Sequence, residues 1–153
     1  MAVPDPMAVP DVTARYATAS DLAFVAQDGY LAERVVRRKV EAGDVFVAER
    51  AGERVGYLRL EHLWAKLPYV ELIRVLAPHR RRGVGRALLA FVEADAAARG
   101  HAVLYSSSQA DESEPQAWHR RMGFEECGFL AGVNEGGVGE VFFRKRLEQM
   151  RGG

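Results

Sequence analysis

Short apolar runs alternate with amphipathic segments along the chain, and this order predicts an α/β fold with helices on both faces of a sheet. The run Tyr69–Ala77 is apolar on both faces, which is typical of a central strand. After it, Val84, Leu88 and Phe91 recur at helical spacing, and the helix they predict ends at Gly100. We also expect strands at residues 12–17, 45–49, 55–63, 102–106, 124–131 and 138–147, and helices that begin at residues 22, 31 and 113.

Capping signals mark the start of two of these helices. Ser20 or Asp21 can cap the helix that begins at residue 22. Ser113 and Gln116 fit a capping box at the start of the short helix, with Pro115 in its first turn.

Composition and charge exclude several classes of protein. The chain has 153 residues, 48% of them hydrophobic, which is enough for the core of one domain. Lys plus Arg and Asp plus Glu both number 21, so the net charge is zero and a nucleic-acid partner is not expected. No apolar run approaches the roughly 20 residues needed to cross a bilayer, and the N-terminus lacks the pattern of a signal peptide. A single cysteine, Cys127, excludes an internal disulfide and a cysteine-based metal cluster. We therefore expect a cytoplasmic protein with no membrane partner and no metal.

The first eleven residues contain the sequence Met-Ala-Val-Pro-Asp twice, beginning at Met1 and again at Met7. Because proline disfavours helix, we interpret residues 1–11 as a flexible leader. Residues 12–150 are then expected to form a single domain.

A basic, glycine-containing turn joins the central strand to the helix that follows it. Arg80, Gly83 and Gly85 fit the pattern Arg-x-x-Gly-x-Gly. Glycines let backbone N–H groups point at an anion, and the helix N-terminus adds the positive end of its dipole. Arginine side chains suit phosphate recognition. The turn therefore predicts a pyrophosphate-binding site; the alternative is an ordinary connection with solvated arginines.

Two other phosphate-binding motifs do not fit this turn. A Walker P-loop needs Lys followed by Ser or Thr after its last glycine, where this chain has Arg86 and Ala87. A Rossmann fingerprint needs a third small residue where Leu88 stands.

The turn resembles motif A of the GNAT superfamily of acyl-CoA-dependent N-acyltransferases, in which it grips the pyrophosphate of coenzyme A. The segment Gln116-Ala-Trp-His-Arg-Arg-Met-Gly-Phe124 is similar to the second signature of that family, a helix that ends in Gly-Phe. The resemblance extends from about Val12 to Leu147. It implies the GNAT fold, an α/β fold with a mixed, mostly antiparallel central sheet of six to seven strands, splayed at the central parallel pair, with helices on both faces.

The same resemblance implies an N-acetyltransferase that moves an acetyl group from acetyl-CoA to a primary amine, by direct transfer in a ternary complex. The acceptor would be a small-molecule or peptide amine. Alternatives are transfer of a longer acyl group and an acyl-CoA-binding sensor with little turnover. Many family members form homodimers, and the sequence leaves the oligomeric state open. The residues implied in binding the cosubstrate are Val75, Leu76, Arg80, Arg81, Arg82, Gly83, Val84, Gly85 and Arg86.

Glu71 is the leading candidate for the base that deprotonates the amine. A charged side chain on a central strand is seldom buried without a partner or a purpose. Some polyamine-type GNAT members place a proposed base glutamate similarly. The alternative is a structural salt bridge with Arg59 or Arg74.

His119 stands four residues before Gly123, where many GNAT members have a tyrosine that protonates the sulfur of coenzyme A. An imidazole can also donate a proton near neutral pH. Alternatively, His119 packs beside the cosubstrate and the weakly basic thiolate leaves unaided. Tyr105 is a second candidate acid, or else a half-buried strand residue.

The remaining unusual residues have structural interpretations. We expect Trp118 to be mainly structural and Cys127 to be a small core residue. The glycine-rich segment 132–139 is expected to be a mobile loop that, by the resemblance, helps to frame the acceptor site.

Overall fold

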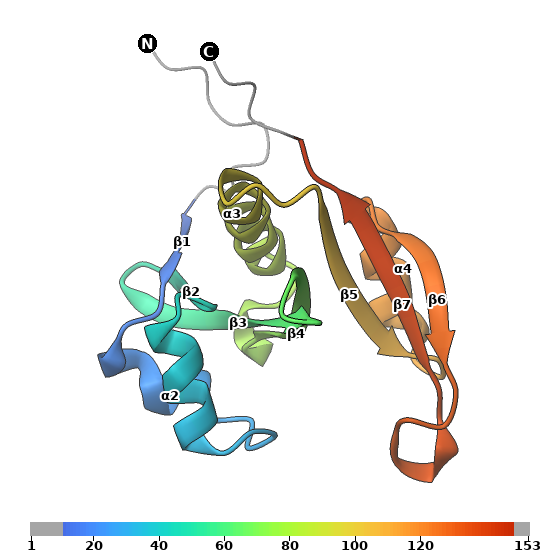
Figure 1. Ribbon diagram of the computed structural model, residues 1–153. Coiled ribbons are helices and arrows are strands. Elements are labelled where there is room, and N and C mark those ends of the chain that lie inside the picture. Colours follow the sequence, from blue (N-terminus) through green and yellow to red (C-terminus); the bar gives the residue numbers. More distant parts are fainter. Residues whose placement is uncertain (1–10, 149–153) are drawn as a thin grey trace. The chain divides into compact units, whose positions relative to one another are not determined.

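A computed structural model describes residues 11–148, so residues 1–10 of the predicted leader lie outside the described residues. Seven strands form one sheet in the order β1-β2-β3-β4-β5-β7-β6 (Figure 1). β4 and β5 are parallel, with Tyr69 opposite Tyr105, whereas β1–β2, β2–β3, β5–β7 and β6–β7 are antiparallel. The mixed sheet confirms the predicted fold class. The strands are β1 (Val12–Tyr16), β2 (Val45–Arg50), β3 (Glu53–Leu63), β4 (Leu67–Val75), β5 (Val103–Gln109), β6 (Glu125–Leu130) and β7 (Glu140–Arg146).

The helices lie close to their predicted positions. They are α1 (Leu22–Val25), α2 (Glu33–Glu41), α3 (Val84–Ala98) and α4 (Ser113–Arg121), with short 3-10 helices η1 (Ala19–Asp21), η2 (Ala77–His79) and η3 (Glu135–Gly137). Within residues 11–148, no helix has the length and apolar character that spanning a bilayer requires.

Contacts divide the chain into two compact units. Within the described residues, unit 1 holds residues 11–60 together with Leu72–Ala94, and unit 2 holds Glu61–Glu71 together with residues 95–148. β4 and α3 each contribute residues to both units. The prediction of a single domain over residues 12–150 stays a prediction.

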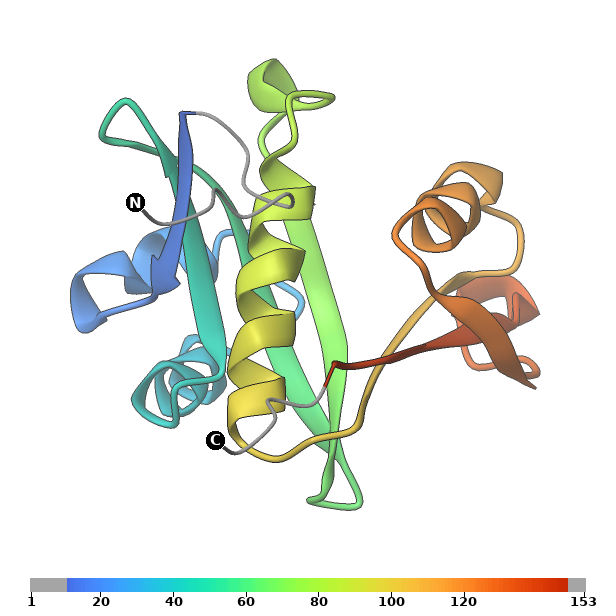
Figure 2. The same ribbon diagram turned by 90° about the horizontal axis from the view of Figure 1, so that it is seen from above.

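Successive side chains of β2 point to opposite faces of the sheet, and in unit 1 α-helices cover both of these faces (Figure 2). Val45 and Val47 point to one face, where they form a core with Val25 of α1 and Val36 of α2. Phe46 points to the other face, where its ring lies 5.7 Å from that of Phe91 on α3. Each fully buried side chain of this kind contributes about 1.5–3 kcal/mol to folding.

Gly56 on β3 sets the close approach of α3. A Cβ atom at this position would lie 2.9 Å from the Arg74 carbonyl oxygen and 3.0 Å from Val84 Cγ1. It would also lie 3.4 Å from Leu88 Cδ1. The first distance is shorter than real Cβ atoms show and the second is unusually tight, so glycine at this position accommodates both the β4 backbone and the N-terminal part of α3.

A buried ion pair ties the α1–α2 connection to β3. The Arg59 guanidinium contacts both carboxylate oxygens of Asp28, and both side chains are fully buried. Arg59 Nη1 also donates to the Val25 carbonyl at 2.7 Å, and the Tyr57 hydroxyl donates to Asp28 at 2.7 Å. Burial alone would raise the pKa of Asp28, but the bonds from Arg59 and Tyr57 outweigh it and hold that pKa well below its usual range. Burial and the bond to Asp28 raise the pKa of Tyr57 to about 12.

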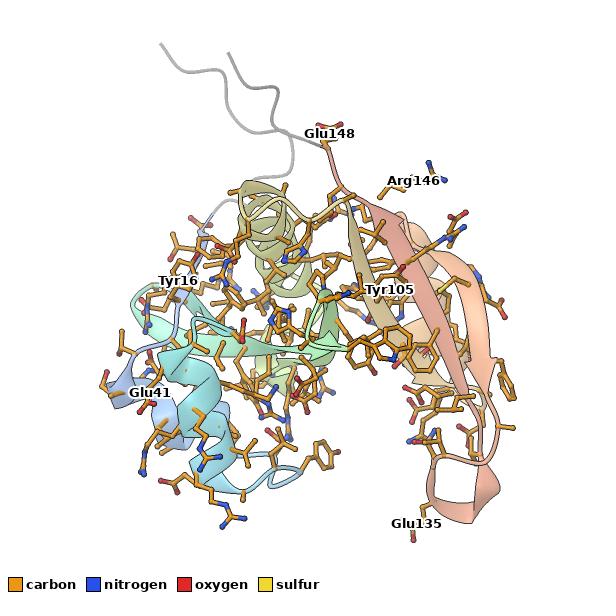
Figure 3. The ribbon with its side chains drawn as sticks, viewed as in Figure 1. Tyr16, Glu41, Tyr105, Glu135, Arg146 and Glu148 are labelled. Carbon is orange, nitrogen blue, oxygen red and sulfur yellow. The ribbon has the colours of Figure 1, made fainter. Side chains whose placement is uncertain are left out.

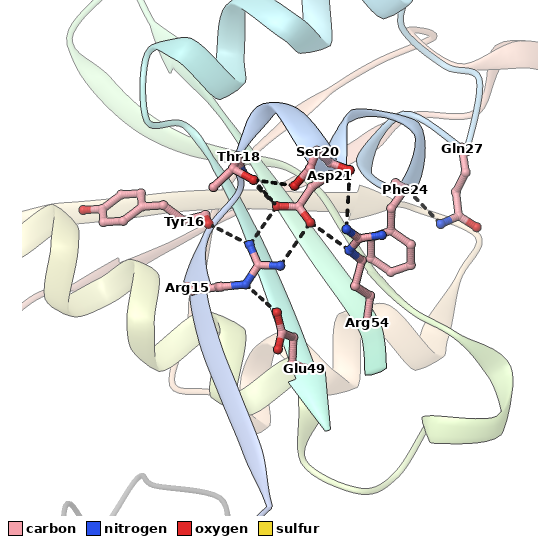
Figure 4. Close-up of polar contacts among 9 residues, drawn as sticks. All are labelled: Arg15, Tyr16, Thr18, Ser20, Asp21, Phe24, Gln27, Glu49 and Arg54. Atoms are coloured by element: carbon pink, nitrogen blue, oxygen red, sulfur yellow. Dashed lines mark hydrogen bonds and ion pairs between the residues drawn. The ribbon is translucent and has the colours of Figure 1, made fainter. Parts of the chain in front are cut away.

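A second charged cluster surrounds Asp21, whose side chain is fully buried (Figure 4). Arg15 binds its carboxylate in a bidentate manner at 2.7 and 3.0 Å, and Arg54 adds a contact at 2.8 Å. The carboxylate also accepts the Thr18 backbone N–H at 2.8 Å. Asp21 occupies the predicted N-cap position of α1, but the expected bond from its side chain to that helix is not formed; the carboxylate instead accepts the Thr18 N–H at the start of η1, and Ser20 bonds Thr18.

In unit 2, α4 packs against β5, and β5 pairs with β7. The capping box predicted for α4 is wrong. Glu112 occupies the N-cap position, Ser113 is the first helical residue, and the Gln116 amide donates to the carbonyls of Gln109 and Ala110. Gln116 thus ties the helix to the end of β5 rather than capping its own N-terminus.

β6 lies at the edge of the sheet and is exposed along its whole length. Its register shifts between Glu126 and Gly128, which leaves Cys127 at a bulge. The prediction that Cys127 belongs to the core is wrong, because the thiol is exposed.

The Asp28–Arg59 pair should dominate the stability of unit 1. Asp28→Asn keeps the side-chain size but removes the carboxylate charge beside a buried guanidinium, so we expect a loss of about 3–5 kcal/mol at neutral pH. The lowered pKa of Asp28 means that the contribution is complete above the unfolded-state value of about 4 and fades as the pH falls below it. Urea unfolding between pH 3 and 8 measures both effects. Tyr57→Phe is the mild control, and equal stability of Asp28→Asn and the native chain would contradict the assignment.

Candidate functional site

The basic turn leads from the end of β4 into α3. β4 ends at Val75, η2 follows, and Arg81 and Gly83 both have positive φ, at 62° and 82°. The Ala87 N–H bonds the Gly83 carbonyl at 3.0 Å, which starts the helix at that glycine. By helix geometry, the N–H groups of the next three residues have no carbonyl one turn before them. These three donors belong to Val84, Gly85 and Arg86.

The arginines of the turn are exposed, as an anion-binding site requires. Arg80 is oriented by the turn itself, because its Nε donates to the Val75 carbonyl oxygen at 3.0 Å. A guanidinium has five N–H donors, so the two terminal NH₂ groups of Arg80 remain able to bind phosphate. Arg81, Arg82 and Arg86 bring further positive charge to the same turn.

Backbone bonds also fix the segment that leads into the turn. The Leu76 N–H donates to the Val55 carbonyl at 2.9 Å, and the Leu76 carbonyl accepts the His79 N–H at 2.8 Å. These bonds occupy the Leu76 N–H and one lone pair of the Leu76 carbonyl, and Arg80 occupies one lone pair of the Val75 carbonyl. The proposed contact of Val75 and Leu76 with the cosubstrate stays a prediction.

His79, in the same turn, was missed by sequence reasoning. Its Nδ1 atom is buried and has no hydrogen-bond partner within residues 11–148. Buried polar atoms are nearly always satisfied, so an unpaired nitrogen beside an anion-binding turn is a signal of a ligand contact. Its position immediately before Arg80 was the only clue in the sequence.

His119 is held at both ring nitrogens in unit 2. Nδ1 faces the Pro115 carbonyl at 2.7 Å, and Nε2 faces the Ser106 hydroxyl at 2.7 Å. Because a carbonyl only accepts, Nδ1 must carry the proton, and neutral Nε2 then accepts from Ser106. The ring stacks on Phe143 with 4.6 Å between centroids, and burial lowers the pKa of His119. The imidazole is therefore a neutral, fully bonded group in this arrangement.

Glu71 and Tyr105, the other candidates for chemistry, are both half-buried strand residues. Glu71 lies two residues after Tyr69 on β4, and its charge acts on the Tyr69 hydroxyl. Arg59, one of its suggested structural partners, binds Asp28, and a salt bridge of Glu71 with Arg59 or Arg74 stays an alternative. Tyr105 extends from β5 (Figure 3). In the register of the sheet it stands opposite Tyr69 of β4 on one side and Arg144 of β7 on the other.

The sequence also did not predict a chain of hydrogen bonds that links side chains of three strands in unit 2. The Tyr69 hydroxyl lies 2.5 Å from Ser107 Oγ, which donates to Glu140 Oε2 at 2.5 Å. Asn134 Nδ2 bonds the other oxygen of Glu140 at 3.0 Å. These residues lie far apart in sequence and belong to β4, β5, β7 and the β6–β7 loop, so no local motif announces them.

The β6–β7 loop contains a short helical turn, η3. Asn134 ties the base of the loop together, since its N–H bonds the Val138 carbonyl at 3.0 Å and its side chain bonds Gly139 and Glu140. Glu135, at the tip, is exposed (Figure 3). The loop's mobility and its place beside the acceptor stay predictions.

Comparison with known proteins places this geometry in context. A family model described as an acetyltransferase (GNAT) domain matches residues 41–126, which include the basic turn and the segment through Gly123 and Phe124. No protein in the curated set matches the chain significantly in sequence.

Solved structures resemble the chain over most of its length. A ribosomal-protein-alanine N-acetyltransferase from Brucella melitensis is 27% identical with a TM-score of 0.73, covering 88% of this chain and 99% of that one. Ard1 from Thermoplasma volcanium is 17% identical with a TM-score of 0.79, covering 91% and 99%. A streptothricin acetyltransferase candidate from Bacillus anthracis, solved with acetyl coenzyme A, is 20% identical with a TM-score of 0.63, covering 68% and 62%. The likenesses below 25% identity support the fold alone.

Proposed function

We propose, since this chain belongs to the GNAT family of acetyltransferases, that it moves an acetyl group from acetyl-CoA to a primary amine by direct transfer in a ternary complex. The observation that carries the proposal is the turn between β4 and α3. It combines exposed arginines, a glycine at positive φ and three helix-terminal N–H groups in a few consecutive residues. A pyrophosphate needs this combination of charge and close backbone donors.

The residues of the turn fit the cosubstrate. The N–H groups of Val84, Gly85 and Arg86 would bind pyrophosphate oxygens, and the free NH₂ groups of Arg80 would add charged hydrogen bonds. Arg81 and Arg82 would neutralise the remaining charge. The unpaired Nδ1 atom of His79 gives the same segment one more donor or acceptor for the ligand.

The acceptor amine must lose a proton before it can attack the thioester. Glu71 is a carboxylate on the strand that leads into the turn, and we propose that it takes this proton. The nitrogen lone pair then forms the amide bond as the carbon–sulfur bond breaks. The sulfur leaves as a thiolate of low basicity, so a general acid is the least demanding role in the reaction.

His119 most simply supports the site as a packed, neutral side chain. Its Nδ1 proton is committed to Pro115 and its Nε2 lone pair to Ser106, so neither nitrogen has a proton to give without breaking a buried bond. This geometry favours the packing alternative over the general-acid role. A release assay for free thiol with a panel of amines separates an active transferase from an acyl-CoA sensor.

The turn can be tested by substitution. Gly83→Val should weaken acetyl-CoA binding strongly, because valine resists the positive φ of this position and crowds the backbone donors. Arg80→Ala should cost about 1–3 kcal/mol of binding free energy for a lost charged hydrogen bond. Calorimetry measures both. Acetyl-pantetheine, which lacks the pyrophosphate, is the control ligand, and its binding should not respond to Arg80→Ala. Unchanged affinity for acetyl-CoA in both variants would exclude the pyrophosphate assignment.

Glu71→Gln keeps the side-chain shape and removes the base. Turnover at neutral pH should fall by about a hundredfold, while acetyl-CoA affinity stays the same. The loss should shrink at high pH, where the free amine is already abundant. The matched control is Glu125→Gln, which changes an exposed glutamate paired with Arg144. Full activity of Glu71→Gln at neutral pH would show that Glu71 is structural.

His119→Phe should lower the unfolding temperature, because the Ser106 hydroxyl and the Pro115 carbonyl lose their partner. If His119 only packs, kcat at saturating substrates should stay within about twofold of the native value. His119→Tyr provides the decisive comparison. A large loss of kcat with phenylalanine that tyrosine restores would establish the general-acid role instead.

A further inference from the structure

The hydrogen-bonded chain from Tyr69 to Glu140 has a defined direction. A serine hydroxyl has one proton, and the Ser107 hydroxyl donates it to the Glu140 carboxylate, which can only accept. Ser107 Oγ must therefore accept from the Tyr69 hydroxyl, 2.5 Å away. The Tyr69 proton is thus committed to Ser107, and its oxygen presents only lone pairs to any further partner.

The Glu140 end of this hydrogen-bonded chain fixes which group donates and which accepts in each bond. Asn134 donates to Glu140 Oε1 at 3.0 Å while Ser107 donates to Oε2, so both carboxylate oxygens carry neutral donors. In the part of the chain that the structure describes, no cationic side chain forms an ion pair with Glu140. A carboxylate at the end of such a chain polarises each O–H in turn and makes the Tyr69 oxygen a stronger acceptor.

Tyr69 is itself well fixed. Its ring stacks on Phe142 with 5.9 Å between centroids. Burial raises the pKa of Tyr69, and the charges of Glu140 and Glu71 add to that effect, so the phenol stays protonated at neutral pH. Glu71 follows two residues later on the same strand, a rise of about 6.6 Å along β4.

We propose that the Tyr69 hydroxyl oxygen accepts a hydrogen bond from the acceptor nitrogen, and that this contact selects primary amines. This inference rests on the proposed function and names a substrate contact within it. Ser107 and Glu140 are positioning residues, which act through Tyr69 by keeping its oxygen an acceptor.

The number of protons on the acceptor nitrogen explains the preference for a primary amine. The substrate ammonium gives one proton to the Glu71 carboxylate and becomes a neutral amine with two N–H groups. One N–H is held by Tyr69 while the lone pair attacks the thioester carbon, and the other proton is lost as the amide forms. The electron pair of the broken carbon–sulfur bond goes to sulfur, and the lost proton balances the thiolate. A secondary amine has a single N–H, which would have to serve both purposes.

The test uses the full chain, acetyl-CoA at saturation, and a panel of an alanine-terminated peptide, spermidine and lysine as acceptors. Tyr69→Phe should raise KM for the best acceptor about tenfold, as expected for one lost hydrogen bond, with kcat within about threefold. The preference for that acceptor over its N-methyl counterpart should narrow. Ser107→Ala should raise KM in the same direction, and Ser107→Thr, which keeps the hydroxyl, should restore it. Tyr16→Phe is the matched control, because it removes a hydroxyl from β1, a different strand.

The outcomes separate this inference from the function on which it rests. A native protein that acetylates no amine in the panel overturns both. Native turnover together with native KM values and native amine preference in Tyr69→Phe overturns this inference and leaves the transferase intact. Calorimetry with acetyl-CoA and thermal unfolding check that each variant is folded. A parallel loss of acetyl-CoA affinity in Tyr69→Phe would show a structural role and also overturn the inference. If Ser107→Ala does not fold, Tyr69→Phe decides the question alone.

Discussion

A guanidinium removed from water needs a counter-charge, and in this protein the pairing of Arg59 with Asp28 meets that need. Arg59 lies within β3, while Asp28 comes from the connection between α1 and α2. Either charge alone would be strongly unfavourable at full burial, so the strand and the connection can only fold together. The Val25 carbonyl, the Tyr57 hydroxyl and the Tyr30 N–H add hydrogen bonds to the pair. Tyr57, which bonds Asp28, belongs to the same core cluster as Val36, Val45 and Val47, so the ion pair and the apolar core share a side chain.

The strands and long helices were predictable because their signals are local. Alternation, helical spacing and glycine at helix ends are properties of neighbouring residues, and the resulting sheet agrees with the structure. The capping bonds were not predictable in the same way, because they depend on which of several nearby partners a side chain chooses. The Asp21 side chain bonds Arg15, Arg54 and the Thr18 N–H, and the Gln116 side chain bonds the end of β5, so neither side chain makes the expected bond to its own helix. Cys127 was misplaced because its sequence context does not reveal an edge strand with a bulge.

In the candidate site, too, some features follow from neighbouring residues and others from contacts that form only in the folded structure. The turn from Arg80 to Arg86 is contiguous, so its anion-binding character can be inferred from sequence. The chain of Tyr69, Ser107 and Glu140 spans three strands and depends on their register, which no short window contains. For His119 the sequence suggested a contact with the cosubstrate but not the two bonds that fix its tautomer. A site made of backbone groups and consecutive residues can be predicted from the sequence. A site made of side chains from separate strands can be identified only in the folded structure.

The absence of a side chain at Gly56 affects how closely α3 packs against β3 in unit 1. Val84, whose N–H belongs to the anion-binding turn, packs within van der Waals reach of this glycine. The first turn of α3 is therefore packed against β3 at a position where the strand has no side chain. The position of the anion-binding turn therefore depends on a residue of another strand that lies outside the turn's own sequence.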